Sequence, residues 1–271
     1  MTTTTHHPWQ KRCAVALAAI ILGLAIVCAM TSVRWVGGTF PGFVILANRV
    51  IAAVSLPHWS IAPRQDVYHH QIVAVNGQPV TTTADVYTTV ATLPPGTPLT
   101  YSLVKGEHHT EVSLPSQVFT VRDYSLLFLA YLFTGLSIAL TGIAVWFLQP
   151  TNAASRALCV AGFTTGVFGI TGADLYGPHW FFRLHIAAEA LFPAAYVHLA
   201  LVFPTDRLRR FRSVCISIPY IIAAALVVAY QLFLYHPTTY SFIYSLCMVY
   251  VGVAGAALLG SVLWDYWTTT S

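Results

Sequence analysis

The chain has 271 residues, of which 56% are hydrophobic and only 8% are charged, and its mean hydropathy is +0.68. A soluble domain carries roughly a quarter charged residues, so this composition excludes an ordinary soluble protein and indicates one that lies in a membrane. The formal net charge of +4 has one dense source, a cluster beside an apolar block that comprises Arg207, Arg209, Arg210 and Arg212. Such a cluster sets orientation in a membrane, so we expect the lipid bilayer as a partner and no nucleic acid.

The first predicted element is a membrane helix over residues 13–33. The run Cys13–Val33 contains no charged residue and has the length of about 20 residues that a helix needs to cross the hydrocarbon layer. Lys11 and Arg12 precede it within a tail at residues 1–12, as they would in a signal peptide. The run is long for a signal sequence and no clean cleavage site follows it, so we predict an uncleaved anchor.

Residues 36–122 have a different character, with prolines, paired histidines and several acidic residues in place of apolar blocks. We expect a small α+β domain inserted after the first helix, with a hairpin turn at Asn76-Gly77 and Thr83 as a helix N-cap. The predicted strands and helix are, in order, Gln71–Val75, Ala84–Leu93, Leu99–Val104 and His108–Leu114. All five cysteines lie in or beside the apolar blocks, so no disulfide framework is expected in this domain.

Two histidine pairs in this domain, His69-His70 and His108-His109, suggest a metal site. Adjacent strand residues point to opposite faces of a sheet, so neither pair can chelate an ion by itself. One histidine of each pair could converge if the two strands were neighbours, and the alternative is that all four are polar residues on an edge. We therefore predict no metal site and no cofactor.

Residues 124–264 hold further apolar blocks, which predict a five-helix membrane bundle followed by a short tail at residues 265–271. The blocks are Tyr124–Phe147, Ala157–Gly172, Leu184–Phe203, Val214–Tyr235 and Phe242–Trp264. The second block is short and rich in glycine, which favours a helix packed closely against its neighbours. The fold class is therefore a polytopic α-helical membrane protein with about six spans.

The short loops predict the orientation, because cytoplasmic loops carry an excess of lysine and arginine. Lys11, Arg12, Arg156 and the arginine cluster fall on one side of the membrane if the spans alternate. The short loops on the other side hold only Arg183. We therefore expect a cytoplasmic amino terminus and place residues 36–122 outside.

An ionisable side chain within a span is costly and points to function. Glu189 is the acidic residue well inside an apolar block, and His185 lies four positions earlier on the same helix face, so the two can pair. His198 lies nine positions beyond Glu189, on the opposite face of the helix. These three residues are candidates for ligand binding or sensing, and a structural polar contact within the bundle is the alternative.

Enzyme signatures give no support for catalysis. The sequence contains no HExxH, GxSxG, P-loop or GxGxxG motif, each of which would place reactive groups at a defined turn or helix face. Gly135-Leu136-Ser137 is a weak hint of a serine centre within a span. We predict no catalytic residue and no enzymatic activity for this chain.

The phrase from Ile72 to Val80, IVAVNGQPV, resembles the second half of bacterial PDZ domains, whose usual phrase is GDxIxxVNGxxV. The matching residues are Ile72, Val75, Asn76 and Gly77. His69-His70 stand where that family has Gly-Asp, and the glycine-rich loop that captures a peptide carboxylate is not recognisable. The resemblance implies a PDZ-like extracytoplasmic domain that binds free carboxyl termini poorly.

The layout of one span, a PDZ-like domain and a helix bundle resembles the sensor half of bacterial membrane receptors such as the competence-pheromone receptor histidine kinases. Short phrases that carry this likeness are residues 41–43, 149–157 and 198–204. It implies a sensor in the bacterial inner (plasma) membrane that receives a peptide, small-molecule or lipid-borne signal and passes it to a cytoplasmic output partner, a missing C-terminal domain or another copy of the chain. The alternatives are a scaffold or adaptor subunit, a small transporter and an intramembrane enzyme.

Overall fold

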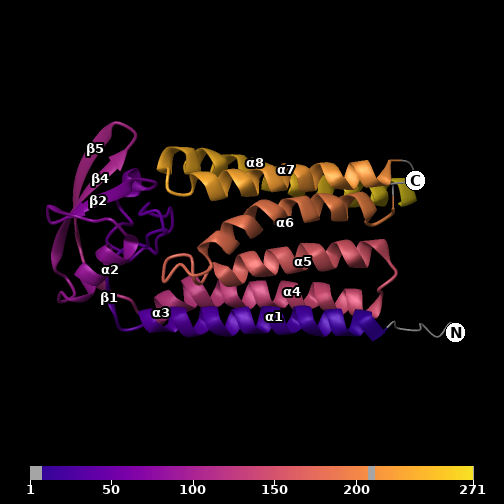
Figure 1. Ribbon diagram of the computed structural model, residues 1–271, viewed down its shortest axis with the longest axis horizontal. Coiled ribbons are helices and arrows are strands. Elements are labelled where there is room, and N and C mark those ends of the chain that lie inside the picture. Colours follow the sequence, from indigo (N-terminus) through magenta and orange to yellow (C-terminus); the bar gives the residue numbers. More distant parts are fainter. Residues whose placement is uncertain (1–7, 207–210, 271) are drawn as a thin grey trace.

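The computed structural model describes residues 8–206 and 211–270. A bundle of long helices forms one part of the molecule, and a domain with a β-sheet covers one end of it (Figure 1). Within the described residues, six helices are long and apolar enough to cross a membrane. The chain is thus a multi-pass helical protein, as its composition predicts. Arg207, Arg209 and Arg210 lie outside the described residues.

The bundle helices follow the apolar blocks closely. They are α1 (Pro8–Ser32), α4 (Ala130–Leu148), α5 (Ala153–Thr171), α6 (Phe182–Val202), α7 (Arg212–Phe233) and α8 (Pro237–Thr270). A short helix α3 (Val121–Tyr124) and a π-helical turn (Ser125–Leu129) lead into α4 as one span. The described parts of both predicted tails are helical, because α1 already includes Lys11 and Arg12 and α8 continues beyond Asp265.

The close packing predicted for the glycine-rich span is present between α4 and α5. A Cβ atom at Gly135 would lie 2.8 Å from the backbone nitrogen of Ile170, and one at Gly162 would lie 2.9 Å from the Ile138 carbonyl oxygen. Glycine permits this approach because only a backbone without side chains leaves room for the opposing backbone. We call this contact the glycine seam, which comprises Gly135, Gly142, Gly162, Gly166 and Gly169.

The sheet domain contains a four-stranded antiparallel sheet in the order β3-β2-β4-β5. Its elements are β2 (Gln71–Val75), β3 (Gln78–Pro79), α2 (Thr83–Ala91), β4 (Pro98–Lys105) and β5 (His108–Pro115). A separate ribbon pairs β1 (Thr39–Phe40) with β6 (Gln117–Val118). β2, β4 and β5 match the predicted strands to within a residue at each end. β3 and the ribbon were not predicted, because two-residue strands leave no periodic pattern.

The phrase that resembles PDZ domains occupies β2 and its turn. Ile72 and Val75 are buried in the core of the sheet domain. Asn76 and Gly77 have φ angles of 49° and 76°, as a tight two-residue hairpin requires. The Asn76 side-chain oxygen also accepts a hydrogen bond from the Thr100 amide at 2.9 Å, so the turn is tied to β4.

The N-cap of α2 is Thr82, and the prediction of Thr83 is wrong by one residue. The Thr82 hydroxyl accepts a hydrogen bond from the Asp85 amide at 3.2 Å, and the Asp85 carboxylate accepts from the Thr82 amide at 2.8 Å. This reciprocal pair satisfies two donors at the start of the helix. Thr83 instead lies in the first turn, where its buried hydroxyl donates to the Leu46 carbonyl at 2.7 Å.

The two histidine pairs do not converge. His108 and His109 pair with Lys105 and Val104 on β4, and β4 separates them from β2, which follows His69-His70. Two strand spacings amount to roughly 10 Å, which is too far for ligands of one ion. Among the residues that the structure describes, no group of three histidine, cysteine, aspartate or glutamate side chains is arranged to hold a metal.

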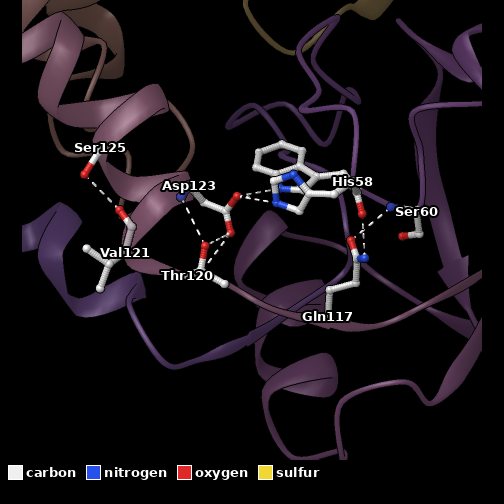
Figure 2. A network of polar contacts seen from close by, with 8 residues as sticks. His58, Ser60, Gln117, Thr120, Val121, Asp123 and Ser125 are labelled. Atoms are coloured by element: carbon white, nitrogen blue, oxygen red, sulfur yellow. Dashed lines mark hydrogen bonds and ion pairs between the residues drawn. The ribbon is translucent and has the colours of Figure 1, made fainter.

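A polar network joins the sheet domain to the start of the second span (Figure 2). The Asp123 side chain is buried at the start of α3. One carboxylate oxygen is 2.7 Å from the His58 Nε2 and 3.1 Å from the Trp59 Nε1, and the other accepts from the Thr120 amide and hydroxyl. This carboxylate therefore cross-links a loop of the sheet domain to the helix that enters the bundle.

Candidate functional site

A cavity of 220 Å³ lies between the sheet domain and the bundle. The sheet domain contributes Leu46, Ala52, Ala53, Val54 and His69 to its wall. The polar side chains contributed by the bundle include Tyr131, Tyr176, His185, Glu189, Tyr240 and Tyr244. Two of the three residues that the sequence singled out within the spans thus meet in one cavity, at the boundary between two parts of the molecule.

Glu189 lies on the inward face of α6 with only 4% of its surface exposed. Its Oε2 accepts a hydrogen bond from the Tyr230 hydroxyl of α7 at 3.2 Å. The Tyr230 ring in turn packs against Tyr240 of α8, with ring centroids 5.5 Å apart. A buried carboxylate is costly unless hydrogen-bonded or paired, and here its partner comes from a neighbouring helix.

His185 lies one turn before Glu189 and is also buried. Its Nδ1 is 3.1 Å from the Thr171 hydroxyl at the end of α5, and its ring stacks on Phe168 with centroids 4.6 Å apart. The predicted pairing of His185 with Glu189 does not form in the described structure. Each side chain has found a partner on a different helix, because interhelical neighbours compete with the residue four positions away.

His198 does not belong to this cavity. It lies toward the other end of α6, where its Nδ1 is 3.2 Å from the Tyr220 hydroxyl of α7. Both His198 and Glu189 contact α7, at Tyr220 and Tyr230, although the sequence predicted them on opposite faces of α6. His198 therefore joins α6 to α7 and is not part of a three-residue site.

His69 lines the cavity, whereas the sequence analysis considered it only as part of the His69-His70 pair in the sheet domain. It has a φ angle of +63°, and its ring lies 6.4 Å from that of Tyr244 on α8. Burial, followed by the nearby charges of Lys105 and His70, lowers the pKa of His69. The sequence feature that could have pointed to His69 is the replacement of the usual Gly-Asp by His69-His70 in the PDZ-like phrase.

Besides the Asp123 network, two further hydrogen bonds hold the sheet domain against the bundle. The Asn48 side-chain amide donates to the Leu234 carbonyl at 3.0 Å, and the His179 Nε2 is 3.2 Å from the Ile45 carbonyl. Burial lowers the pKa of His179, although the bond to Ile45 opposes that shift. Loops on two sides of the bundle therefore restrain the segment that supplies Leu46 to the cavity.

Asp174 is a second buried carboxylate, in the loop between α5 and α6. Its Oδ2 accepts a hydrogen bond from the Phe181 amide at 2.7 Å, whereas its buried Oδ1 has no hydrogen-bond partner among the described residues. Burial raises the pKa of Asp174 to about 6, and the bond from Phe181 offsets part of that shift. This loop thus holds a carboxyl group that titrates in a mildly acidic range.

A larger groove of 460 Å³ runs between α2 and the β1 strand, beside the end of α1. Tyr87 and Thr88 of α2 face Thr39 and Phe40 of β1 across it. Trp35, which follows α1, packs edge-on against Tyr87 with ring centroids 4.9 Å apart. The groove is mainly apolar, because aromatic and aliphatic groups form most of its wall.

Comparison of the chain with known protein families, with characterised proteins and with solved structures finds no match. Its function therefore has to be inferred from the physical character of the site. The informative features are the location of the cavity between two parts of the molecule and the buried carboxylate in its wall.

Proposed function

We propose that this chain is a membrane-embedded sensor or receptor module whose signal is received in the cavity between the sheet domain and the bundle. The observation that carries the proposal is the shared wall, to which His69 comes from one part and Glu189 from the other. A ligand bound there touches both parts at once. It can therefore stabilise one arrangement of the two relative to another, which is the requirement for signal transmission.

The proposed orientation places the sheet domain outside a bacterial plasma membrane. Lys11, Arg12, Arg156 and Arg212 lie near the starts of α1, α5 and α7, at the end of the bundle away from the sheet domain (Figure 1). Charge bias in short loops sets orientation, whereas long segments such as the sheet domain cross largely regardless of charge. A cysteine introduced at Glu107 should react with an impermeant reagent from outside intact cells, and one at Arg156 should not.

We also propose that the sheet domain is PDZ-like in its second half. The β2–β3 hairpin, α2 and the β4–β5 hairpin follow in the order that the resemblance implies. The groove between α2 and β1 is partly filled by Trp35 and bordered by the bundle loop at Gly177 and Pro178. Those contacts favour a groove used by the protein's own membrane part over one that captures free peptide carboxyl termini.

The signal leaves as a change in helix packing that a partner reads, either a cytoplasmic output protein or a second copy of the chain. Glu189 of α6 contacts Tyr230 of α7 and lies in one wall with Tyr240 of α8. A ligand that binds the Glu189 carboxylate therefore acts at a point where side chains of three helices meet. The seam between α4 and α5 offers a fixed frame for such a movement.

The test measures the distance between the two parts in the reconstituted full chain. Spin labels at Glu107, on the β4–β5 turn, and at the exposed Tyr235, beyond α7, report on the sheet domain and the bundle. We expect Asn48→Ala combined with His179→Ala to broaden the distance distribution or shift it. A pair at Tyr235 and the exposed Trp264 of α8 is the control, which should not change. An unchanged, narrow distribution in the variant contradicts the sensor and favours the scaffold.

A further inference from the structure

We propose that the cavity binds a small organic cation, a primary amine or a quaternary ammonium compound, through the Glu189 carboxylate and the faces of the surrounding tyrosine rings. This proposal rests on the proposed function in that it assigns a ligand class to the same cavity. The cation site also goes beyond the proposed function, because cation binding can be measured without any signal output.

The charge of the cavity selects the sign of the ligand. Among the described residues that line the cavity, Glu189 is the one with an acidic side chain, and none is a lysine or arginine. The other titratable groups facing it, besides the tyrosines, are His69 and His185. A cation offsets the cost of burying the carboxylate, whereas an anion would add a second uncompensated charge.

Hydrogen-bonding capacity at Glu189 is left over for a ligand. Among the described residues, the carboxylate accepts its hydrogen bond from Tyr230. An ionised carboxylate offers about four lone-pair sites on two oxygens. An ammonium group can therefore donate to Glu189 without displacing Tyr230 from α7.

Aromatic side chains surround the carboxylate from several elements. Tyr131 comes from α4, Tyr176 from the loop after α5, and Tyr240 and Tyr244 from successive turns of α8. A cation over the face of an aromatic ring is attracted by the negative charge of that face, and cages of such rings hold quaternary ammonium ligands in proteins. The combination of one carboxylate with four tyrosines favours a cation over a neutral polar molecule.

The size of the cavity limits the ligand to a small one. Its 220 Å³ falls below the range of roughly 300–1,000 Å³ typical of sites for drug-sized molecules. Ala52, Val54 and Met248 supply apolar wall for the alkyl part of the ligand. A folded peptide does not fit, so the ligand is a free amine or a similar compact cation.

The experiment uses the full chain in lipid nanodiscs at neutral pH, with choline and n-butylammonium as probes and 3,3-dimethylbutanol as the uncharged analogue of choline. Saturable binding is followed by calorimetry and by the shift in thermal unfolding temperature. We expect at least one cation to bind and the uncharged analogue to bind at least about tenfold more weakly. Glu189→Gln should weaken cation binding by about tenfold or more, whereas Glu107→Gln, the same change at an exposed site, should have no effect.

A second variant keeps the proposal testable if Glu189→Gln fails to fold. Tyr244→Leu removes a ring from the wall and should weaken cation binding, and Tyr244→Phe, which keeps the ring face, should bind nearly as well as the original. Absence of binding by both cations, equal binding of the uncharged analogue, or insensitivity to all of these variants would overturn the proposal. If a cation binds and the distance between spin labels at Glu107 and Tyr235 is the same with and without it, the sensor is refuted and the cation site stands. If the distance changes in the variant with Asn48→Ala and His179→Ala but no cation binds, the cation site is refuted and the sensor proposal stands.

Discussion

The glycine seam and the interface between the sheet domain and the bundle represent opposite ways of joining parts of one chain. At the seam, backbone approaches backbone, so that a single added methyl at Gly135 or Gly142 would meet main-chain atoms at 2.8 Å. At the other interface, a cavity of 220 Å³ remains, and Glu189 is buried beside it. Close packing of backbone against backbone permits one arrangement, whereas we expect an interface that contains a cavity to permit more than one. We therefore expect α4 and α5 to be rigid and the sheet domain to be able to shift where it rests on the bundle.

The largest expected effect comes from breaking the seam. Gly135→Ala should lower the free energy of unfolding by about 1–3 kcal/mol or more, because its Cβ would meet backbone atoms of α5 that cannot move aside. Gly252→Ala is the matched control, since nothing lies within 4 Å of a Cβ at that position of α8. The measurement is thermal or detergent unfolding of both variants. Equal stability of the two would show that the seam is not rigid.

A buried carboxylate next to the adaptable interface should give the second effect. The pKa of Asp174 is raised from 3.8 to about 6 by burial, so its ionisation costs the folded state stability as pH rises between those values. Asp174→Asn keeps an oxygen for the Phe181 amide and should stabilise the protein by about 1–3 kcal/mol at pH 7.5 and by little at pH 4. Unfolding measured across that pH range tests this.

The control for Asp174 is Asp66→Asn at an exposed site, where the Arg64 partner lowers the pKa of the carboxyl group. That substitution should not stabilise the protein at neutral pH. A stabilisation by Asp174→Asn that is the same at pH 4 and pH 7.5 would sink the explanation by buried charge.

The third effect concerns a contact that holds the sheet domain on the bundle. Asn48→Ala removes the donor to the Leu234 carbonyl and leaves that buried acceptor without its partner. We expect a loss of about 1–2 kcal/mol and faster hydrogen exchange in residues 44–52, with α4 and α5 unchanged. Thr97→Ala, which removes a hydrogen bond within the sheet domain, is the control. Faster exchange spread evenly over the bundle would contradict the separation of rigid and adaptable parts.

The smallest effect should stay within the sheet domain. Thr82→Ala removes the N-cap of α2 and should cost about 1 kcal/mol. Hydrogen bonds from Thr82 and Thr81 lower the pKa of Asp85 to about 2, so its contribution is present above pH 3.8 and lost as pH falls toward 2. Circular dichroism during acid titration checks this, and loss of cavity ligand binding in Thr82→Ala at neutral pH would show unexpected coupling to the interface.

Much of the fold follows from local sequence. The membrane helices can be predicted because a run of about 20 apolar residues has the length and composition of a helix that crosses the hydrocarbon layer. Gln71–Val75 and its Asn76-Gly77 turn are predicted because alternation and positive φ are local properties. The first and last residues of the helices are predicted less accurately, as α1 and α8 show. Polar residues beyond an apolar run can extend a helix without adding to its hydropathy.

The candidate site was only half determined by the sequence. Glu189 and His185 stood out because a charge or imidazole inside an apolar run is costly wherever the helix packs. Their partners, Tyr230 and Thr171, come from α7 and α5. No local pattern distinguishes such residues from other polar groups in apolar helices, so only the packing of helices against one another decides which of them meet.

The position of His69 in the cavity depends on tertiary structure alone. It lies 175 positions from Tyr244 in the chain, yet their ring centroids are 6.4 Å apart. Residue type and spacing determined which segments cross the membrane and which fold beside it, because those preferences act over a few residues. How the sheet domain rests on the bundle was decided by long-range contacts such as Asn48 with Leu234. Those contacts form the cavity, since neither part contains its complete wall.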